Sequence, residues 1–520
     1  MTGQKAIFDR ATLAFVGLAL LILALRIWGL VATPLNLQAD EAQYWSWSRH
    51  LDFGYFSKPP LIAWVVAGTT SLFGDAEWAV RLTAPVAHTL AALALFGLGR
   101  SAYGATVGVW AGLSWLLLPG VFLSAGVMST DALVLPLWSI ALFCAWRLVV
   151  SRSWAWPIAL GLVLGLGVLA KYAMLYFVLC AALAAYWSIP VRDALKGGRW
   201  AAVVGVGLLV MSPNLYWNVT HHFETVGHTV SNAHLTHNLI HPEEVFEFIG
   251  SQAAVIGPVL FCALGWMLWR AWMRSAGLSD QDRFLIAFIL PPILLMIVQA
   301  FLSRANGNWA AVAYPAAIVW IAGTLAASKR GRAVLIAATL VNFAMGAVFG
   351  FAALRPDLAD RVKSLSNSIK RARGWDETAH QIALRATPHP GEPPYTAVLV
   401  DDRDLFYELN YYWREARREG APLPPVRMWK LYSGPHNSAE SNDPMRPEEG
   451  ARVLIVHQNA RYVPLVAADF TVFRAVEPLS VSQGAVHPRV FEVSVGEGFA
   501  PAPRDAAFMQ RIHGIDTGSD

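Results

Sequence analysis

Apolar residues occur in long runs over the first two thirds of the chain and in short runs after that. About eleven of the long runs approach the length needed to cross a hydrocarbon core about 30 Å thick. The pattern predicts an α-helical membrane protein with about eleven spans, near residues 13–32, 77–98, 105–122, 131–149, 154–170, 172–189, 201–217, 249–269, 284–302, 309–327 and 333–354. A shorter apolar run at 60–73 predicts a helix lying at the membrane interface.

The composition changes abruptly after Arg355, where charged residues, prolines and short alternating stretches replace the long apolar runs. Strands are predicted at 395–400 and 452–457, helices at 372–386 and 405–418, and a long loop at 433–447. We therefore expect two domains: a transmembrane domain at 1–354 with an external loop at 33–76, and a soluble mixed α/β domain at 355–520.

Composition supports this division and narrows the class of protein. Hydrophobic residues make up 55% of the chain and charged residues 15%, which is typical of a polytopic membrane protein. The net charge of +4 gives no indication of nucleic-acid binding. The three cysteines all lie inside apolar runs, so a disulfide framework is not expected. Because no small-residue cleavage site follows residues 13–32, this run is expected to be retained as the first helix.

Lysine and arginine predict the orientation of the spans. With the N-terminus in the cytoplasm, every cytoplasmic connection contains basic residues, from Lys5 and Arg10 at the start to Lys329 and Arg330 before the last span. An odd number of spans then places the domain after Arg355 outside the cytoplasm, in the periplasm of a Gram-negative bacterium.

Ionisable residues that the loops do not explain collect on the predicted outer side. Each of them alone is compatible with a helix cap or a topology-setting charge, but charges at membrane depth are costly, and their convergence on one face indicates a functional site. These residues are Asp40, Glu41 and Lys58 in the first external loop, Asp131 at the head of the fourth span, Lys171 between the fifth and sixth spans, and Arg304 after the ninth.

Acids beside cations at an outer membrane surface suit a substrate that is both anionic and lipid-anchored. Glycosyl transfer from a polyprenyl-phosphate sugar has these requirements. Asp40 would take the proton from an attacking hydroxyl, with inversion at the anomeric carbon, and Glu41 would orient a substrate. The leaving group is a lipid phosphate, whose developing charge Lys58, Lys171 and Arg304 would stabilise.

Short motifs in the membrane part carry a family resemblance. They are Asp40-Glu41-Ala42 with Tyr44-Trp45, GYFSKPPLIAW at 54–64, Phe-Gly-Asp and Ala-Val-Arg-Leu within 73–82, Ser-Thr-Asp at 129–131, Leu-Ala-Lys-Tyr at 169–172, and Gly-Asn-Trp-Ala-Ala at 307–311. As a set, over residues 10–350, they resemble bacterial membrane glycosyltransferases related to the protein O-mannosyltransferases and to the lipid A aminoarabinose transferase.

This resemblance implies a GT-C fold in a bacterial inner membrane, a polyprenyl-phosphate sugar donor, a catalytic carboxylate at Asp40 and a phosphate-binding lysine at Lys58. It adds Tyr55, Arg81 and Asn308, which lie in the matching motifs, to the expected substrate-binding residues. The aminoarabinose transferases commonly carry a metal-associated glutamate where this chain has Ser57. The absence of this glutamate argues against a metal at this position and makes the match to the aminoarabinose transferases weaker than the match to the general class. A divalent metal elsewhere is possible, but no metal ligand is assigned.

Six histidines crowd the segment 218–250, where a zinc site or a solvated external loop would both be compatible with the pattern. No cysteine joins them and no short motif fixes a ligand geometry. His221 or His222 is expected to contact a substrate phosphate, because both follow the seventh span, and His222 is kept as the candidate site residue. The full set is His221, His222, His228, His234, His237 and His241.

Three glycines of the fifth predicted span, Gly161, Gly165 and Gly167, form a small-residue stripe that predicts close helix packing.

Two rival functions remain open on the sequence. Asp402-Arg403-Asp404 after a predicted strand resembles the Asp-x-Asp of nucleotide-sugar transferases, although a cap at the end of the strand also explains it. A transporter or flippase of lipid-linked sugars is the second alternative, and it would favour an internal inverted repeat, which the chain does not show by inspection. The sugar and the acceptor, whether lipid A, another envelope glycolipid or protein hydroxyls, are not fixed by the sequence.

Overall fold

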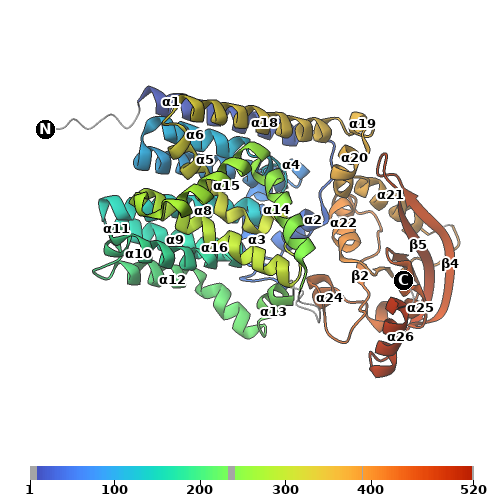
Figure 1. The fold of residues 1–520 in the computed structure, drawn as a ribbon. Coiled ribbons are helices and arrows are strands. Elements are labelled where there is room, and N and C mark those ends of the chain that lie inside the picture. Colours follow the sequence, from blue (N-terminus) through green and yellow to red (C-terminus); the bar gives the residue numbers. More distant parts are fainter. Residues whose placement is uncertain (1–8, 232–239, 389, 518–520) are drawn as a thin grey trace. The chain divides into compact units, whose positions relative to one another are not determined.

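The computed structural model describes residues 9–231, 240–388 and 390–517 (Figure 1). The chain divides into two compact units. The first unit comprises Met1–Ala32 and Leu51–Gly350, and the second comprises Thr33–His50 and Phe351–Asp520. The predicted external loop at 33–76 is therefore shared between the two units, with its first part in the second unit.

The first unit is built from helices, most of them apolar. Among the described residues, seven helical segments are long and apolar enough to cross a membrane, and four further apolar helices are shorter. The helices are α1 (Arg10–Ala32), α3 (Leu61–Phe73), α4 (Glu77–Arg81), α5 (Thr83–Tyr103), α6 (Ala105–Leu117), α7 (Pro119–Ser124), α8 (Thr130–Ser151), α9 (Ala155–Ala170), α10 (Tyr176–Trp187), α11 (Ile189–Ala194), α12 (Arg199–Thr220), α13 (Glu224–Ser231), α14 (Pro242–Ile256), α15 (Pro258–Met273), α16 (Asp280–Leu302), α17 (Tyr314–Leu325) and α18 (Lys329–Leu354).

The run at 249–269 is not the single straight span that its hydropathy predicts. The chain bends by 117° there, between helices α14 and α15. Gly257, with φ of +86°, ends α14 in the left-handed region, and Pro258 begins α15. Asn342 Nδ2 donates to the Ile256 carbonyl at 3.2 Å, which satisfies a backbone group released by the bend. A window of hydropathy alone does not detect such a break.

Aromatic side chains form part of the core of the first unit. Trp138 of α8 meets Phe177 of α10 edge-on at 5.1 Å, and Phe288 of α16 lies 4.6 Å from Phe177. Each of these three side chains is almost completely buried. Such edge and tilted ring pairs add to the energy of area burial, so this cluster ties three helices together.

The small-residue stripe of α9 packs closely against α12, as predicted. A Cβ added at Gly161 would lie 2.6 Å from the Val203 carbonyl, and one at Gly165 would lie 2.9 Å from the Gly207 carbonyl. Gly167 instead makes room for the side chain of Met174. Two of the three glycines therefore allow the backbones of α9 and α12 to approach each other.

We expect Gly161→Ala to lower the thermal midpoint of the full-length protein in detergent by several degrees, because the new methyl group meets a backbone carbonyl that cannot move without separating the helices. A cost of about 1–3 kcal/mol is typical of such overpacking. Gly205→Ala in α12 is the matched control, because a Cβ there has no neighbour within 4 Å. Equal midpoints for the two variants would contradict the close-packing interpretation.

The second unit contains a five-stranded sheet in the order β2-β1-β3-β5-β4. Its strands are β1 (Ala397–Val400), β2 (Val426–Met428), β3 (Val453–His457), β4 (Phe470–Val481) and β5 (Arg489–Phe499). β1 runs parallel to both β2 and β3, whereas β5 runs antiparallel to β3 and to β4. The long β4–β5 pair is visible in Figure 1. The fully buried strands β1 and β3 lie within the two predicted strand ranges, which are confirmed.

Short helices complete the second unit. They are α2 (Ala39–Ser48), α19 (Pro356–Ala359), α20 (Lys363–Ile369), α21 (Trp375–Ala386), α22 (Arg403–Tyr412), α23 (Arg414–Arg418), α24 (Ser438–Asn442), α25 (Val463–Ala467) and α26 (Ala506–Thr517). The helix predicted at 405–418 is two helices, because the chain breaks at Trp413. The loop predicted at 433–447 contains the short helix α24.

Helix α2 is held in the second unit by its own N-terminal segment and by α22. The Trp375 amide donates to Asn36 Oδ1 at 2.9 Å, and the Leu37 amide donates to Tyr412 Oη at 3.0 Å. The Trp45 ring meets Tyr411 edge-on at 5.1 Å. Asn36, Leu37, Trp45 and Tyr411 are all buried, so the sequence before and within α2 belongs to the core of this unit.

Candidate functional site

Three of the predicted site residues meet at the head of α8 in the first unit. Ser129 Oγ accepts from the Ala132 amide and caps the helix, which leaves Asp131 in its first turn. Lys171 Nζ lies 2.7 Å from Asp131 Oδ1, and Asn308 Nδ2 donates to Asp131 Oδ2 at 2.7 Å. Both carboxylate oxygens are therefore engaged, and the negative charge of Asp131 is matched by Lys171.

Lys171 reaches Asp131 because of the local backbone. It follows α9 in an extended conformation, with φ of −162°, and the next four residues, Tyr172–Leu175, form a 3₁₀ turn before α10. Tyr172 uses this turn to place its hydroxyl between two amides of α12, donating to Asn214 Oδ1 at 3.1 Å and accepting from Asn218 Nδ2 at 3.1 Å. Both asparagines are buried. These two asparagines were not among the predicted site residues.

Hydrogen bonds hold the segment from Asp52 to Lys58 against α12. Trp217 Nε1 donates to Asp52 Oδ2 at 2.8 Å, and Asn214 Nδ2 donates to the Phe53 carbonyl at 2.7 Å. A Cβ at Gly54 would clash with the Trp217 ring, so only glycine allows this approach. Asp52 was not predicted as a site residue, and its partner in α12 lies too far along the sequence for local pattern to reveal the contact.

Tyr55 and Lys58 close a small turn within that segment. The Tyr55 amide donates to the Lys58 carbonyl at 3.1 Å, and Thr225 Oγ1 of α13 donates to the Tyr55 carbonyl at 2.7 Å. Burial is the main reason that the pKa of Tyr55 is raised to about 12, so its hydroxyl stays protonated near neutral pH. Tyr55 is buried and Lys58 is half-buried.

The remaining predicted residues of the first unit occupy different surroundings. Arg81 ends α4 and is almost completely buried, whereas Arg304 is an exposed residue in the segment between α16 and α17. His222 is exposed at the end of α12 with φ of +52°. The neighbouring His221 stacks on Trp217 at 4.0 Å.

Asp40 lies in the first turn of α2 in the second unit. Its side chain is 54% exposed, and Oδ1 accepts from Arg403 Nη2 at 3.0 Å. The same guanidinium donates to Gln43 Oε1 at 2.9 Å and lies 3.3 Å from Asp404 Oδ1. Burial opposes the charge of Arg403, but the carboxylates of Asp40 and then Asp404 outweigh it and raise its pKa. Asp40 is therefore an accessible carboxylate in a fixed orientation.

Glu41 has a different environment from Asp40 although it is the next residue. Its side chain is fully buried, and Oε2 accepts from the Gln38 amide at 2.9 Å. This contact satisfies a donor at the start of α2, as a capping residue does. The geometry thus gives Glu41 a contact that shapes the helix carrying Asp40.

A cavity of about 850 Å³ lies beside Asp40 within the second unit, and we call it the basic cavity. Its wall contains five basic side chains, Lys363, Lys370, Arg371, Arg403 and Arg489, together with the acids Asp40 and Asp404. Arg489 lies over the Trp375 ring at 3.5 Å, and burial lowers its pKa to about 10. An excess of positive charge beside an accessible carboxylate suits an anionic substrate.

The Asp402-Arg403-Asp404 motif is explained by its local structure. Asp402 Oδ1 accepts from the amides of Asp404 and Leu405 at 2.7 and 3.3 Å and so caps α22. Burial is the main cause that raises the pKa of Asp402 to about 6. The carboxylate of Asp402 thus caps α22, and the carboxylate of Asp404 pairs with Arg403.

The sequence offers two places to look for a metal site, the histidine cluster at 218–250 and the position of Ser57. His234 and His237 lie outside the described residues. Within the described ranges, no group of three His, Cys, Asp or Glu side chains is gathered closely enough to hold a metal ion. Ser57 offers only a hydroxyl where the aminoarabinose transferases have a carboxylate, so no chemical step is assigned to a metal.

Comparison with known proteins identifies the class. Residues 57–217 match the family model described as dolichyl-phosphate-mannose-protein mannosyltransferase. The lipid A galacturonosyltransferase RgtD of Rhizobium johnstonii is 34% identical over 412 residues, which cover 76% of this chain and 82% of the relative.

Two solved structures of ArnT from Cupriavidus metallidurans share the fold. The apo form has a TM-score of 0.59 at 18% identity, and the form bound to undecaprenyl phosphate has a TM-score of 0.60 at 16% identity. Each match covers 95% of this chain and 99% of the other. The protein is thus a multi-pass membrane glycosyltransferase with the GT-C fold. Within that class, it belongs to the ArnT-like family. Membership of a transferase family removes the support for a transporter.

Removing either member of the Asp131–Lys171 pair is expected to destabilise the first unit. The side chains are only 18% and 26% exposed, so Asp131→Ala or Lys171→Met leaves a poorly solvated charge at a cost of about 1–3 kcal/mol. We expect each single variant to lower the thermal midpoint and the double variant to lower it by no more than the larger single effect. Strictly additive shifts would show that the two side chains are not coupled.

Proposed function

We propose that this protein is an inverting glycosyltransferase that moves a sugar from a polyprenyl-phosphate donor to a hydroxyl of an envelope glycolipid. The observation that carries this proposal is Asp40, an exposed carboxylate that Arg403 orients at the wall of the basic cavity. A base with this access can accept the proton of an incoming hydroxyl, while the cations around it attract an anionic acceptor.

Asp40 acts as the general base in this proposal. It removes the proton from the acceptor hydroxyl as the oxygen attacks the anomeric carbon. The bond between that carbon and the phosphate oxygen breaks, the electron pair leaves with the polyprenyl phosphate, and the configuration inverts in a single displacement. Arg403 is a positioning residue, because it holds the carboxylate through Oδ1.

Residues of the first unit bind the donor in this proposal. Lys58 and Arg304 stabilise the charge that develops on the leaving phosphate. Asp131 already contacts both Lys171 and Asn308, and Lys171 neutralises Asp131. In this proposal, the three side chains bind the donor in the positions that these contacts hold. Tyr55, Arg81 and His222 complete the proposed contacts. The similarity in fold to ArnT, which has been solved with undecaprenyl phosphate bound, supports a polyprenyl phosphate as the carrier.

The acceptor that we propose is lipid A or a related phosphorylated glycolipid, and the sugar is a uronic acid. The name of the 34% identical relative, a lipid A galacturonosyltransferase, supports both choices. The excess of basic side chains in the basic cavity supports an acceptor that carries negative charge. A protein hydroxyl offers no comparable charge.

We further propose that the enzyme lies in the bacterial inner membrane, with its N-terminus in the cytoplasm and the second unit in the periplasm. The distribution of lysine and arginine between the loops supports this orientation. An acceptor in the outer leaflet would then meet the second unit on the same side of the membrane.

Asp40→Asn is expected to reduce sugar transfer by about 10²–10⁴-fold, because the amide keeps the shape of the side chain but accepts no proton. Lys58→Ala is expected to reduce transfer by about 10²–10³-fold through loss of phosphate stabilisation. The measurement is transfer of radiolabelled sugar from a panel of polyprenyl-phosphate sugars, including a uronic acid, to purified lipid A by full-length enzyme in detergent.

Asp376→Asn is the matched control, because Asp376 is also an exposed acid in the first turn of a helix of the second unit. It should retain native transfer. Native rates in both Asp40→Asn and Lys58→Ala would refute the proposed roles. No transfer to lipid A from any donor of the panel would refute the proposed acceptor. Transfer to lipid A only from a neutral sugar would refute the proposed sugar while leaving the transferase class intact.

A further inference from the structure

A second cavity, of about 660 Å³, lies within the second unit and shares no lining residue with the basic cavity. Five arginines line it, Arg49, Arg414, Arg417, Arg418 and Arg427, and we call it the arginine cavity. Asp443 is the one acid among the described residues of its wall. Positive charge is therefore concentrated here even more strongly than beside Asp40.

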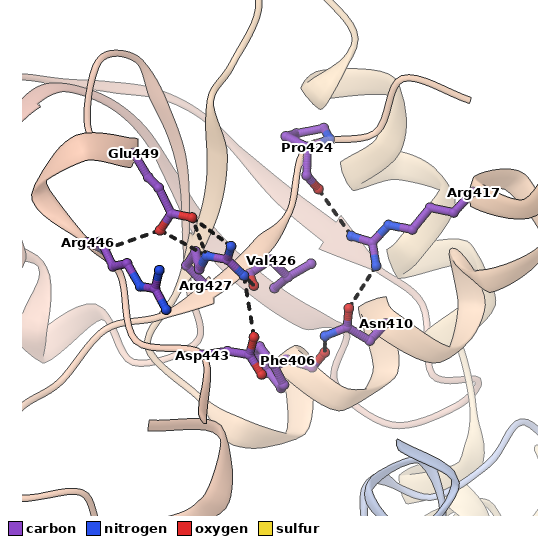
Figure 2. A network of polar contacts seen from close by, with 9 residues as sticks. All are labelled: Phe406, Asn410, Arg417, Pro424, Val426, Arg427, Asp443, Arg446 and Glu449. Atoms are coloured by element: carbon purple, nitrogen blue, oxygen red, sulfur yellow. Dashed lines mark hydrogen bonds and ion pairs between the residues drawn. The ribbon is translucent and has the colours of Figure 1, made fainter. Parts of the chain in front are cut away.

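The arginines of this cavity are not equally compensated. Arg427 is neutralised, since Glu449 lies 2.6 Å from its Nη2 and Asp443 lies 3.4 Å from its Nη1 (Figure 2). Arg417 donates to two neutral oxygens, Asn410 Oδ1 at 2.8 Å and the Pro424 carbonyl at 3.1 Å (Figure 2). In the described part of the chain, Arg417 has no acidic partner.

Arg417 is half-buried, and burial, followed by the nearby charge of Arg427, lowers its pKa. A guanidinium in such a place costs free energy unless an anion joins it. Its plane also lies over the Trp413 ring at 5.3 Å, which leaves less freedom to be lost when a ligand binds. The site is therefore prepared for an anion that the chain itself does not supply.

Other arginines of the wall are similarly stacked. Arg49 lies over the Trp45 ring at 5.4 Å, and Arg414 lies over Tyr411 at 3.8 Å. Nη2 of Arg414 lies 3.2 Å from Glu415 Oε1, whereas its Nε atom is buried without a hydrogen-bond partner. Planar guanidinium groups held in this way match the oxygens of a phosphate through paired hydrogen bonds. A phosphate monoester, with up to two negative charges, meets several such groups better than a single carboxylate does.

Both cavities are built on α2. The basic cavity takes Gln38, Ala39 and Asp40 from the beginning of the helix, whereas the arginine cavity takes Trp45, Ser46 and Arg49 from its end. At a rise of 1.5 Å per residue, Asp40 and Ser46 are about 9 Å apart along the helix axis. A ligand whose charged groups lie on separate sugar rings would be able to use both.

We propose that the arginine cavity binds a phosphate group of the acceptor glycolipid and thereby selects which acceptor hydroxyl is presented to Asp40. This inference rests on the proposed function for the identity of the acceptor. It assigns the arginine cavity to specificity and leaves the reaction itself to the residues already described.

The test is equilibrium binding of radiolabelled lipid A to the full-length protein in detergent, with lipid A that carries its phosphates compared with lipid A from which they have been removed. Arg417→Gln and Arg49→Gln are each expected to weaken binding of the phosphorylated form by about tenfold or more, the usual effect of losing a charged hydrogen bond. Binding of the form without phosphates should be unchanged.

Two variants are used because Arg417 also supports the Pro424 carbonyl, whereas Arg49 is exposed at the end of α2. Arg474→Gln, an exposed arginine on β4, is the control and should bind as the native protein does. Native affinity for phosphorylated lipid A in both Arg417→Gln and Arg49→Gln would overturn the proposal. Equal competition by phosphatidylglycerol added in the same detergent micelles would also overturn it, because the cavity would then bind a phospholipid headgroup.

Binding requires no turnover, so the two proposals fail separately. Phosphate-dependent binding without any sugar transfer would refute the proposed function and leave the arginine cavity as a lipid A phosphate site. Sugar transfer combined with phosphate-independent binding would refute the arginine cavity alone.

Discussion

The position of Asp40 depends on the packing of α2 against the rest of the second unit. A helix of ten residues is marginal in water by itself, so its position and stability must come from packing. Buried contacts supply both: Asn36 accepts from the Trp375 amide, and Trp45 packs on Tyr411. The conformation of Asp40 is consequently determined by residues more than 300 positions away, through α21 and α22.

Much of the fold was predictable because the membrane imposes simple rules on sequence. A run of apolar residues must form a helix there, and an ionisable residue at its end must find a partner. These two rules were sufficient to find Asp131 and Lys171, which the structure joins directly, and the resemblance in motifs added Asn308. The buried strands β1 and β3 were equally clear, because each is a short apolar run between turn residues.

The rest could not be predicted, since it depends on contacts without a local signal. Nothing near Asp40 indicates that Arg403 will orient it. No local pattern predicts that Asp40 is exposed whereas Glu41 is buried in a cap, and the family resemblance was needed to place the catalytic carboxylate at Asp40. The sharp bend at Gly257 interrupts an apolar run whose hydropathy is continuous. The long β4–β5 pair was missed because charged and exposed residues along β4 hide its strand pattern.

The candidate sites of the two units handle charge differently, and the difference has a physical reason. In the first unit, Asp131 and Lys171 neutralise each other because an apolar surrounding makes an isolated charge expensive. In the second unit, water can reach exposed groups, so an excess of cations can persist around the basic and arginine cavities at lower cost. A half-buried arginine without an acidic partner, such as Arg417, still pays a desolvation cost in that setting. Such a residue is therefore better explained by a ligand than by stability, whereas a matched pair such as Asp131–Lys171 is compatible with either.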